Sequence, residues 1–219
     1  MSKASPLTAF DIFANLTEES LARIEALAIR RRLQKGQLLY TDGELLEQFC
    51  IVASGRIRFY ASNESGKEFV LGTVESGALV GEGAMLLEEP FGANALAEDD
   101  CELLVIHRRD LDTLLNDCPQ IKDQLLHSMI VKCRALGNMV KSLALMDVYG
   151  RVRQLFERLA VERDGVTMLS EPLTQQAIAD RVGASREMIA KIMKELVFGG
   201  YVRIDNRQLV LLQPLPERF

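Results

Sequence analysis

Few residues of this sequence can build a metal centre or a disulfide framework. The 219 residues include only two histidines and four cysteines, and the cysteines (Cys50, Cys101, Cys118 and Cys133) lie far apart with no CxxC pair. This spacing argues against a zinc knuckle, an iron–sulfur cluster and a secreted disulfide scaffold. We therefore expect no metal site and reduced thiols.

Long apolar runs are missing as well. No run approaches the roughly 20 residues of a membrane helix, and the first residues, MSKASPLTAF, lack the apolar core of a secretory signal. These absences predict a soluble, cytoplasmic protein with no membrane partner. The hydrophobic share of 48% and the charged share of 26% are nevertheless typical of a globular protein that buries its cores.

An excess of positive charge is also absent, since the formal net charge is −5. The charge is unevenly divided: residues 1–147 hold 15 Lys and Arg against 22 Asp and Glu, whereas residues 148–219 hold 11 against 9. A nucleic-acid interface needs only local positive potential, so the acidic total does not exclude one. The division indicates that the first part of the chain does not face DNA.

The pattern of residues 1–118 predicts a helix followed by a β domain. Residues 7–28 have the pattern of a short amphipathic helix, in which Thr17 can act as the N-cap. From about residue 30 to residue 109, short runs such as FCIVA and EFVLGTV are rich in β-branched and aromatic residues and are separated by glycine. We expect a β-roll of the double-stranded β-helix or jelly-roll type.

Residues 119–147 predict one long helix that begins at Pro119. Apolar residues recur there at alternating steps of three and four, the a and d positions of a heptad: Leu126, Met129, Cys133, Leu136, Val140 and Leu143. Polar residues flank this stripe: Lys122, Lys132, Arg134, Asn138 and Lys141. A helix lying on its own domain's core is the alternative, but the narrow stripe favours a homodimer.

Residues 148–219 predict a winged helix. VYGRVRQLFERLAVER has the pattern of an amphipathic helix, TQQAIADRVGASREMIAKIMKEL that of a helix–turn–helix, and YVRIDNRQLVLL that of two strands joined at Asp205–Asn206. The whole chain is then an α+β protein. We expect an effector-sensing β-roll over residues 1–118, a dimerisation helix and hinge over 119–147, and a winged helix–turn–helix over 148–219.

The helix–turn–helix carries the candidate DNA contacts. Thr174 and Ser185 can cap its first and second helices, and Gly183 can form the tight turn between them. An apolar stripe over Ile189, Ile192, Met193 and Leu196 would bury one side of the second helix. The candidate DNA-binding residues are Thr174, Gln175, Ser185, Arg186, Glu187, Lys191 and Lys194. Recognition helices read bases from their first turns, where Arg can contact guanine and Glu can accept from the cytosine amino group.

The segments LALMDVYGRVRQLFERLA and LTQQAIADRVGASREMIAKIMKEL, with ALVGEGAMLLEEP upstream, resemble the CRP/FNR family of bacterial transcription regulators over nearly the whole chain. The resemblance implies a homodimer that binds palindromic double-stranded DNA and recruits or blocks RNA polymerase. Ser185, Arg186 and Glu187 match the family's S-R-E-x-x-x-R motif, which reads TGTGA-like half-sites. Lys191 stands where the second Arg belongs and cannot make its bidentate fork.

The same resemblance identifies candidate effector-binding residues: Gly81, Glu82, Gly83, Ala93, Asn94 and Leu136. In cAMP-binding relatives the Glu holds the ribose hydroxyl, an Arg pairs with the phosphate, and hydroxyl residues of the long helix face the adenine. Here Ala93 and Asn94 stand at the positions of the Arg and its Ser or Thr neighbour, and Leu136 and Gly137 stand at the hydroxyl positions. Because a charge-assisted phosphate contact is lost, cAMP is disfavoured.

The sequence disfavours some other effectors and is compatible with several more. An iron–sulfur sensor needs an N-terminal cysteine cluster, and the first cysteine is Cys50. Haem would depend on a lone histidine, His107 or His127, and is disfavoured. Cys133 can meet its copy across the dimer axis, although a buried apolar role is favoured. A cyclic nucleotide, a cyclic dinucleotide, another metabolite or no ligand at all are compatible with the sequence.

The leading hypothesis is a sequence-specific transcription regulator in which rotation about a hinge near residues 146–150 sets the spacing of two recognition helices. The alternative is a ligand-sensing β-roll protein that acts through a protein partner, with a vestigial DNA arm, and the intact Arg186 and Glu187 argue against it. No Ser/His/Asp or Cys/His set is evident, so we expect no enzyme and no catalytic residues.

Overall fold

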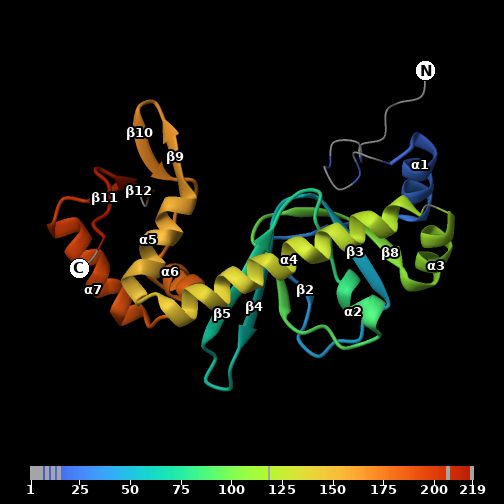
Figure 1. Ribbon diagram of the computed structural model, residues 1–219, viewed down its shortest axis with the longest axis horizontal. Coiled ribbons are helices and arrows are strands. Elements are labelled where there is room, and N and C mark those ends of the chain that lie inside the picture. The colour runs from blue at the N-terminus through green and yellow to red at the C-terminus, as the bar shows by residue number, and fades with distance from the viewer. Residues whose placement is uncertain are drawn as a thin grey trace. The chain divides into compact units, whose positions relative to one another are not determined.

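Figure 1 shows the computed structural model of the chain, which describes residues 7, 10, 13, 16–117, 119–205 and 208–217. The chain divides into two compact units, residues 1–61 with 71–135 and residues 62–70 with 136–219. The expected α+β architecture is confirmed, with N-terminal β-sheets, a long helix and a C-terminal helix–turn–helix domain.

The chain's β-roll is built from two four-stranded sheets, in the orders β1-β8-β3-β6 and β2-β7-β4-β5, and it belongs to the first unit except for residues 62–70. The strands are β1 (Ile29–Leu33), β2 (Leu38–Tyr40), β3 (Gln48–Ser54), β4 (Ile57–Ser62), β5 (Glu68–Val74), β6 (Leu79–Val80), β7 (Asn94–Ala97) and β8 (Cys101–His107). The helices are α1 (Glu18–Leu27), α2 (Glu82–Leu87), α3 (Arg108–Asp117) and α4 (Gln120–Leu145), and α4 continues into the second unit.

Strand β3 shows why the run FCIVA is apolar at successive positions. Cys50 and Val52 face the core between the two sheets, whereas Phe49 and Ile51 pack on the opposite side with residues of α1, α3 and the start of α4. A strand covered on both faces has no polar side, so its sequence does not alternate.

Helix α1 begins at Glu18, later than residue 7. Thr17 is the expected N-cap, and its hydroxyl accepts a hydrogen bond from the backbone N–H of Ser20 at 3.2 Å. Leu7 and Phe13 precede the helix and are buried in the same core as α1. The other residues expected in this helix that precede Leu16, apart from Phe10, lie outside the described residues.

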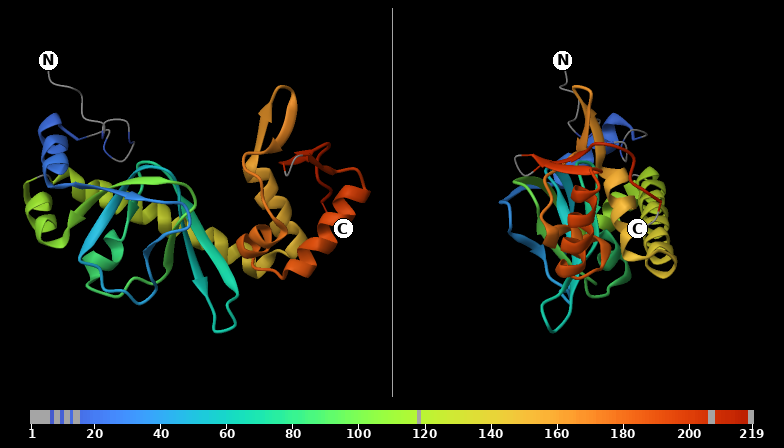
Figure 2. Two further views of the ribbon diagram at one scale, coloured as in Figure 1. Left: turned by 180° about the vertical axis from the view of Figure 1, so that it is seen from behind. Right: turned by 90° about the vertical axis from the view of Figure 1, so that its left-hand side faces the viewer.

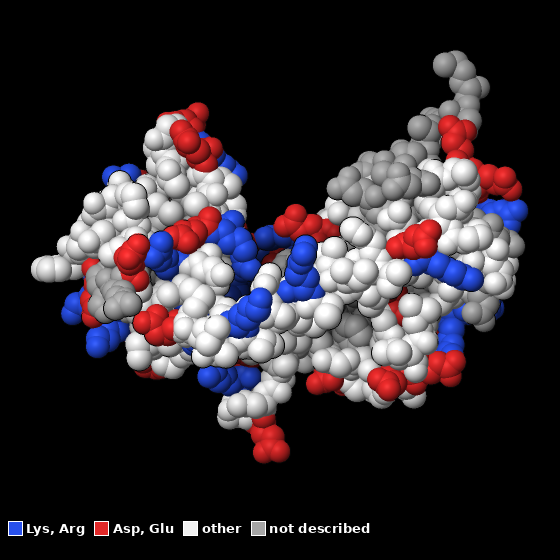
Figure 3. Space-filling model, in the orientation of Figure 1, with Lys and Arg blue, Asp and Glu red and all other residues white. Residues whose placement is uncertain are grey.

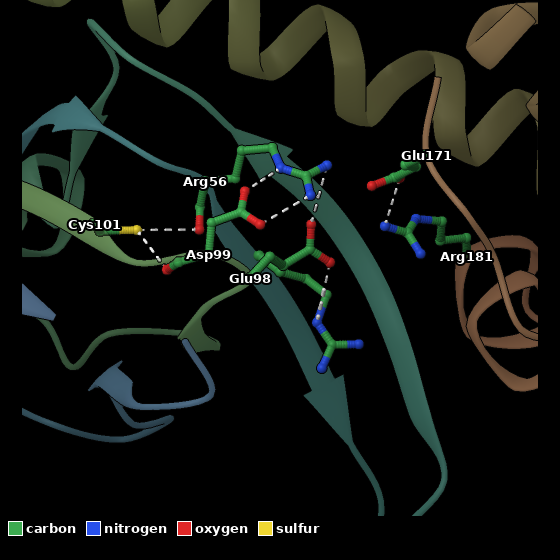
Figure 4. Close-up of polar contacts among 7 residues, drawn as sticks. Arg56, Glu98, Asp99, Cys101, Glu171 and Arg181 are labelled. Atoms are coloured by element: carbon green, nitrogen blue, oxygen red, sulfur yellow. Dashed lines mark hydrogen bonds and ion pairs between the residues drawn. The ribbon is translucent and has the colours of Figure 1, made fainter. Parts of the chain in front are cut away.

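An ion-pair group ties the loop between β7 and β8 to the start of β4 (Figure 4). Arg56 Nε donates to Asp99 Oδ2 at 2.6 Å, and Arg56 Nη2 donates to Asp99 Oδ1 at 3.3 Å. Glu98 lies 3.9 Å from Arg56 and 3.8 Å from Arg58. The hydrogen bond from Arg56 lowers the pKa of the Asp99 carboxyl, against a smaller opposing effect of burial.

The second unit contains α5 (Val148–Leu159), β9 (Ala160–Arg163), β10 (Val166–Leu169), α6 (Gln175–Val182), α7 (Arg186–Phe198), β11 (Val202–Asp205) and β12 (Gln208–Leu211). Its strands form one sheet in the order β11-β12-β10-β9, and Figure 2 shows the two hairpins in orange and red. The expected strand pair after the helix–turn–helix is present, although Asn206 of its turn lies outside the described residues.

The helix expected over residues 148–163 is too long. It ends at Leu159, and Ala160–Arg163 instead pairs antiparallel with β10. Asp164 and Gly165 both have positive φ, at 52° and 74°, as a two-residue type I′ hairpin turn requires. The Asp-Gly pair and the valines on either side of it outweigh the helical pattern of AVER.

Arg151 holds three parts of the second unit together. Its Nε donates to the Val182 carbonyl at the end of α6, and its Nη1 donates to the Met146 carbonyl just after α4, both at 2.8 Å. Asp147 caps α5 by accepting from the Gly150 N–H at 2.7 Å. One guanidinium thus fixes α5 against the first helix of the helix–turn–helix.

The Arg56–Asp99 pair predicts a pH-dependent contribution to stability. Asp99→Asn is expected to lower the free energy of unfolding at pH 7 by up to about 1 kcal/mol, because the pair is partly exposed. Since the folded pKa of Asp99 is depressed, this contribution is present above the unfolded value of about 3.9 and is lost as the pH falls through the folded one.

Urea unfolding at pH 7 and at pH 3 measures the effect of Asp99→Asn. The difference from wild type should shrink at pH 3, and the exposed Glu89→Gln should show no comparable difference at either pH. A difference of equal size at both pH values contradicts the assignment.

The Arg151 contacts predict a second loss of stability. Arg151→Met keeps much of the side chain's apolar stem but leaves two carbonyls without their charged donor, so we expect a loss of about 1–3 kcal/mol. Arg158→Met, on the exposed side of the same helix, is the matched control and should change stability by less than about 0.5 kcal/mol. Equal losses in the two variants, measured by urea unfolding, would show that the Arg151 hydrogen bonds to Met146 and Val182 do not stabilise the fold.

Candidate nucleic-acid interface and effector site

Both helices of the helix–turn–helix begin at the expected caps. The Thr174 hydroxyl accepts from the Ala177 N–H at 3.1 Å, and the Ser185 hydroxyl accepts from the Met188 N–H at 3.2 Å. Gly183 ends α6 with a positive φ of 68°, a conformation that side chains with a Cβ rarely adopt. Caps and turn together fix where the second helix starts.

Helix α7 buries one side and exposes the other. Ile189, Ile192, Met193 and Leu196 are all in the core of the second unit. The opposite side presents the predicted contacts of this helix, which are all exposed: Arg186, Glu187, Lys191 and Lys194. Thr174 and Gln175 are likewise exposed at the start of α6. The structure therefore brings the candidate DNA-binding residues to the two helix N-termini and along one face of α7.

Glu187 is held in its ionised form. Hydrogen bonds to its own backbone N–H and to the Ser185 side chain lower the pKa of its carboxyl, and the neighbouring Arg186 charge contributes less. The carboxylate of a first-turn residue is also favoured by the positive end of the helix dipole. At neutral pH this position therefore offers a hydrogen-bond acceptor beside the cationic donor Arg186.

Sequence reasoning missed several residues of this domain. Asp180 is buried and accepts from Gln176 Nε2 at 2.7 Å, and Arg181 pairs with Glu171 at 3.0 Å (Figure 4). The first contact lies within α6 at the i,i+4 spacing, whereas the second ties α6 to the loop that precedes it, and no periodicity in the sequence signals the Arg181–Glu171 pair. Phe198 is 94% exposed at the end of α7, four residues after Lys194 and so on the same face, where an apolar residue was not expected.

The surface charge is mixed. Figure 3 shows Lys and Arg side chains among Asp and Glu side chains on the face in view. Positive potential for a nucleic acid therefore depends on local groups such as those of α7.

The stripe predicted for dimerisation lies largely exposed along α4. Leu126, Leu136, Val140 and Leu143 are all exposed, with Val140 at 64%, and Cys133 is an exposed thiol. Met129 is half-buried. Ile130 and Val131, which the heptad assignment left out, are exposed as well. An apolar stripe of this length on one helix is typical of a surface that pairs with another protein chain.

Three consecutive effector candidates, Gly81, Glu82 and Gly83, lie where β6 leads into α2. Gly81 is the N-cap of α2, with φ 92°, and Glu82 behind it is only 2% exposed. Lys132 of α4 donates to Glu82 Oε1 and, at 3.0 Å, to the Leu79 carbonyl. In the sequence Lys132 is only a polar flank of the apolar stripe, because nothing in the local pattern joins residues 50 positions apart.

The other effector candidates are placed as follows. Gly83 follows Glu82 in α2, and Ala93 is buried. Asn94 begins β7, and its Oδ1 accepts from the Asp42 N–H at 3.2 Å. Leu136 belongs to the second unit and is exposed on α4.

Clusters of metal-ligating side chains and membrane-spanning helices are both absent from the described parts of the chain. Residues 16–117, 119–205 and 208–217, with Leu7, Phe10 and Phe13, contain no group of three or more His, Cys, Asp or Glu side chains that could hold a metal ion. None of the helices over these same residues is long and apolar enough to cross a membrane.

Two family models match the chain. Residues 30–118 match the cyclic nucleotide-binding domain, and residues 150–215 match the Crp-like helix-turn-helix domain. The first match covers most of the β-roll, and the second covers α6, α7 and the sheet of the second unit.

Several proteins similar to this chain are named as regulators that respond to a cyclic nucleotide or dinucleotide, or as receptors of one. A CRP-like cAMP-activated global transcriptional regulator of Mycobacterium tuberculosis is 26% identical over 193 residues, which cover 84% of this chain and 86% of that protein. A cyclic AMP receptor protein of Thermus thermophilus is 27% identical over 218 residues, 97% of each. The solved structure of the c-di-GMP responsive global regulator CLP of Xanthomonas campestris shares the fold, with a TM-score of 0.81, 24% identity and coverage of 90% of this chain and 100% of that one.

The cyclic nucleotide-binding match thus precedes the Crp-like helix-turn-helix match along the chain, with the long helix α4 between them. The chain belongs to the CRP/FNR family of transcription regulators.

Proposed function

We propose that the protein is a homodimeric transcription regulator that binds a palindromic site with TGTGA-like half-sites and is not controlled by cAMP in the usual way. Residues 1–118 would sense an effector, residues 119–147 would pair and hinge the two copies, and residues 148–219 would bind DNA. The observation that carries the proposal is the exposed face of α7, where Arg186 and an ionised Glu187 share the first turn.

Base chemistry supports the half-site. The Arg186 guanidinium can donate two hydrogen bonds to guanine O6 and N7, and the Glu187 carboxylate can accept from the cytosine amino group. Lys191 and Lys194 lie further along the same exposed face and supply contacts to a base or to phosphates. Thr174, Gln175 and Ser185 flank the helix N-termini, which are suited to phosphate oxygens.

The exposed surface of α4 supports a homodimer, as a palindromic site requires. The exposed stripe of α4 matches the a and d pattern of a helix that pairs with a parallel copy of itself. A two-fold dimer would carry two α7 helices to successive major grooves if they lie about 34 Å apart. RNA polymerase is the partner that membership of this family leads us to propose.

The β-roll is the domain that would bind the effector, and its match and its residues indicate the effector class. The matched cyclic nucleotide-binding domain supports a cyclic nucleotide or a cyclic dinucleotide as the effector class. Similar proteins differ in their effector, since one is named as cAMP-activated and another as c-di-GMP responsive. Ala93 offers no cation to a cyclic phosphate, and this absence is our reason for disfavouring cAMP.

Removal of the Arg186 guanidinium tests the DNA assignment. Arg186→Ala is expected to weaken binding by about 1–3 kcal/mol for each half-site, without dissociating the dimer. Fluorescence anisotropy on a TGTGA-N6-TCACA duplex at fixed salt measures the affinity, and size-exclusion chromatography with light scattering measures the dimer. Arg109→Ala, which removes an exposed arginine of α3 in the other unit, is the control.

Unchanged affinity in Arg186→Ala would contradict the recognition-helix assignment. The same titration repeated with saturating cAMP tests the effector statement, because we expect wild-type affinity to stay the same. Binding that appears only when cAMP is added would overturn it.

A further inference from the structure

Glu82 is an unusual residue in the β-roll because it is charged and buried. The buried polar or charged residues among those described are Ser20, Glu82 and Asp180, and Glu82 is the most deeply buried of the three. A carboxylate removed from water is stable only when donors satisfy it. The identity of the donor therefore indicates what this position is built to hold.

The donor is a side chain of the protein itself. Lys132 reaches from α4, and its Nζ donates both to Glu82 Oε1, in the first turn of α2, and to the carbonyl of Leu79, the first residue of β6. Met129 lies one turn earlier on α4, with its Sδ 3.9 Å from the point that a Cβ on Gly83 would occupy. Both α4 side chains thus lie against the start of α2.

The chemistry of Glu82 indicates which ligand group would compete with Lys132 for its carboxylate. A carboxylate only accepts hydrogen bonds, so its ligands must be donors, such as an ammonium group or a sugar hydroxyl. The domain matches the cyclic nucleotide-binding model, and a 3′,5′-cyclic nucleotide has a single free ribose hydroxyl, at the 2′ position. Lys132 and that hydroxyl compete for the same acceptor.

We propose that Lys132 is a tethered occupant of the ribose position at Glu82, and that a ribonucleotide binds this β-roll only by displacing it. Lys132 is part of the same chain, so it competes at a high effective concentration. The residue thereby selects against ribonucleotides and ties α4 to α2. This inference rests on the part of the proposed function that makes residues 1–118 an effector domain.

Isothermal titration of the full chain with cAMP and with 2′-deoxy-cAMP tests the proposal independently of DNA. Lys132→Met is compared with wild type, and Ala93→Arg/Lys132→Met with Ala93→Arg, in which a guanidinium is available for the phosphate. In at least one of these backgrounds the loss of Lys132 should tighten cAMP binding at least tenfold. The 2′-deoxy nucleotide should show no such gain, because it lacks the competing hydroxyl.

Further variants separate this role from a merely structural ion pair. Lys122→Met removes an exposed lysine of the same helix and should bind cAMP as wild type does. Adding Glu82→Gln to Lys132→Met should abolish the gain, since the neutral amide is a weaker acceptor. If Lys132→Met does not fold, as judged by circular dichroism, Lys132→Gln keeps a donor for Glu82 and should show a smaller gain in the same direction.

Equal cAMP affinities with and without Lys132 in folded proteins, including no binding to any of them, would overturn the proposal. A gain shared equally by the 2′-deoxy nucleotide would also overturn it. These outcomes do not depend on whether the wild-type protein binds the TGTGA duplex, so failure of the DNA assignment is distinguishable from failure of this one.

Discussion

The burial of one side of helix α7 is the constraint on which the DNA-binding domain depends. Ile189, Ile192 and Leu196 lie in the core with α5, α6 and the sheet of the second unit. Because a helix that buries one stripe must turn the other outward, the position of Arg186 and Glu187 follows from packing rather than from any contact of their own. The Ser185 cap and the left-handed Gly183 then determine where this exposed face begins.

The features that the sequence predicted well are local. Caps at Thr17, Thr174 and Ser185, the turn at Gly183 and the buried stripe of α7 each depend on residues within a few positions of one another, and the structure has all of them. Propensity, periodicity and cap chemistry act at this range. The a and d pattern of α4 is visible for the same reason, and its apolar residues are largely exposed.

The features that the sequence could not give depend on distant partners. Arg151 joins Met146 and Val182, and Lys132 joins Glu82, through contacts that no periodic pattern encodes. The β9–β10 hairpin was missed for a different reason. Its Asp164–Gly165 turn is a recognisable signal, but the helical pattern of the preceding residues was extended across Ala160–Arg163, where pairing with β10 prevails.

The central claim is that two copies of this chain present two α7 helices to successive major grooves. The most direct test is the dependence of DNA affinity on the spacer between TGTGA and TCACA, measured by anisotropy at fixed salt. A six-base-pair spacer puts the half-site centres about one helical turn apart. The account predicts an affinity at this spacing at least tenfold higher than with about half a turn added. Equal affinity at every spacing would show that the two helices are not coupled in a symmetric dimer.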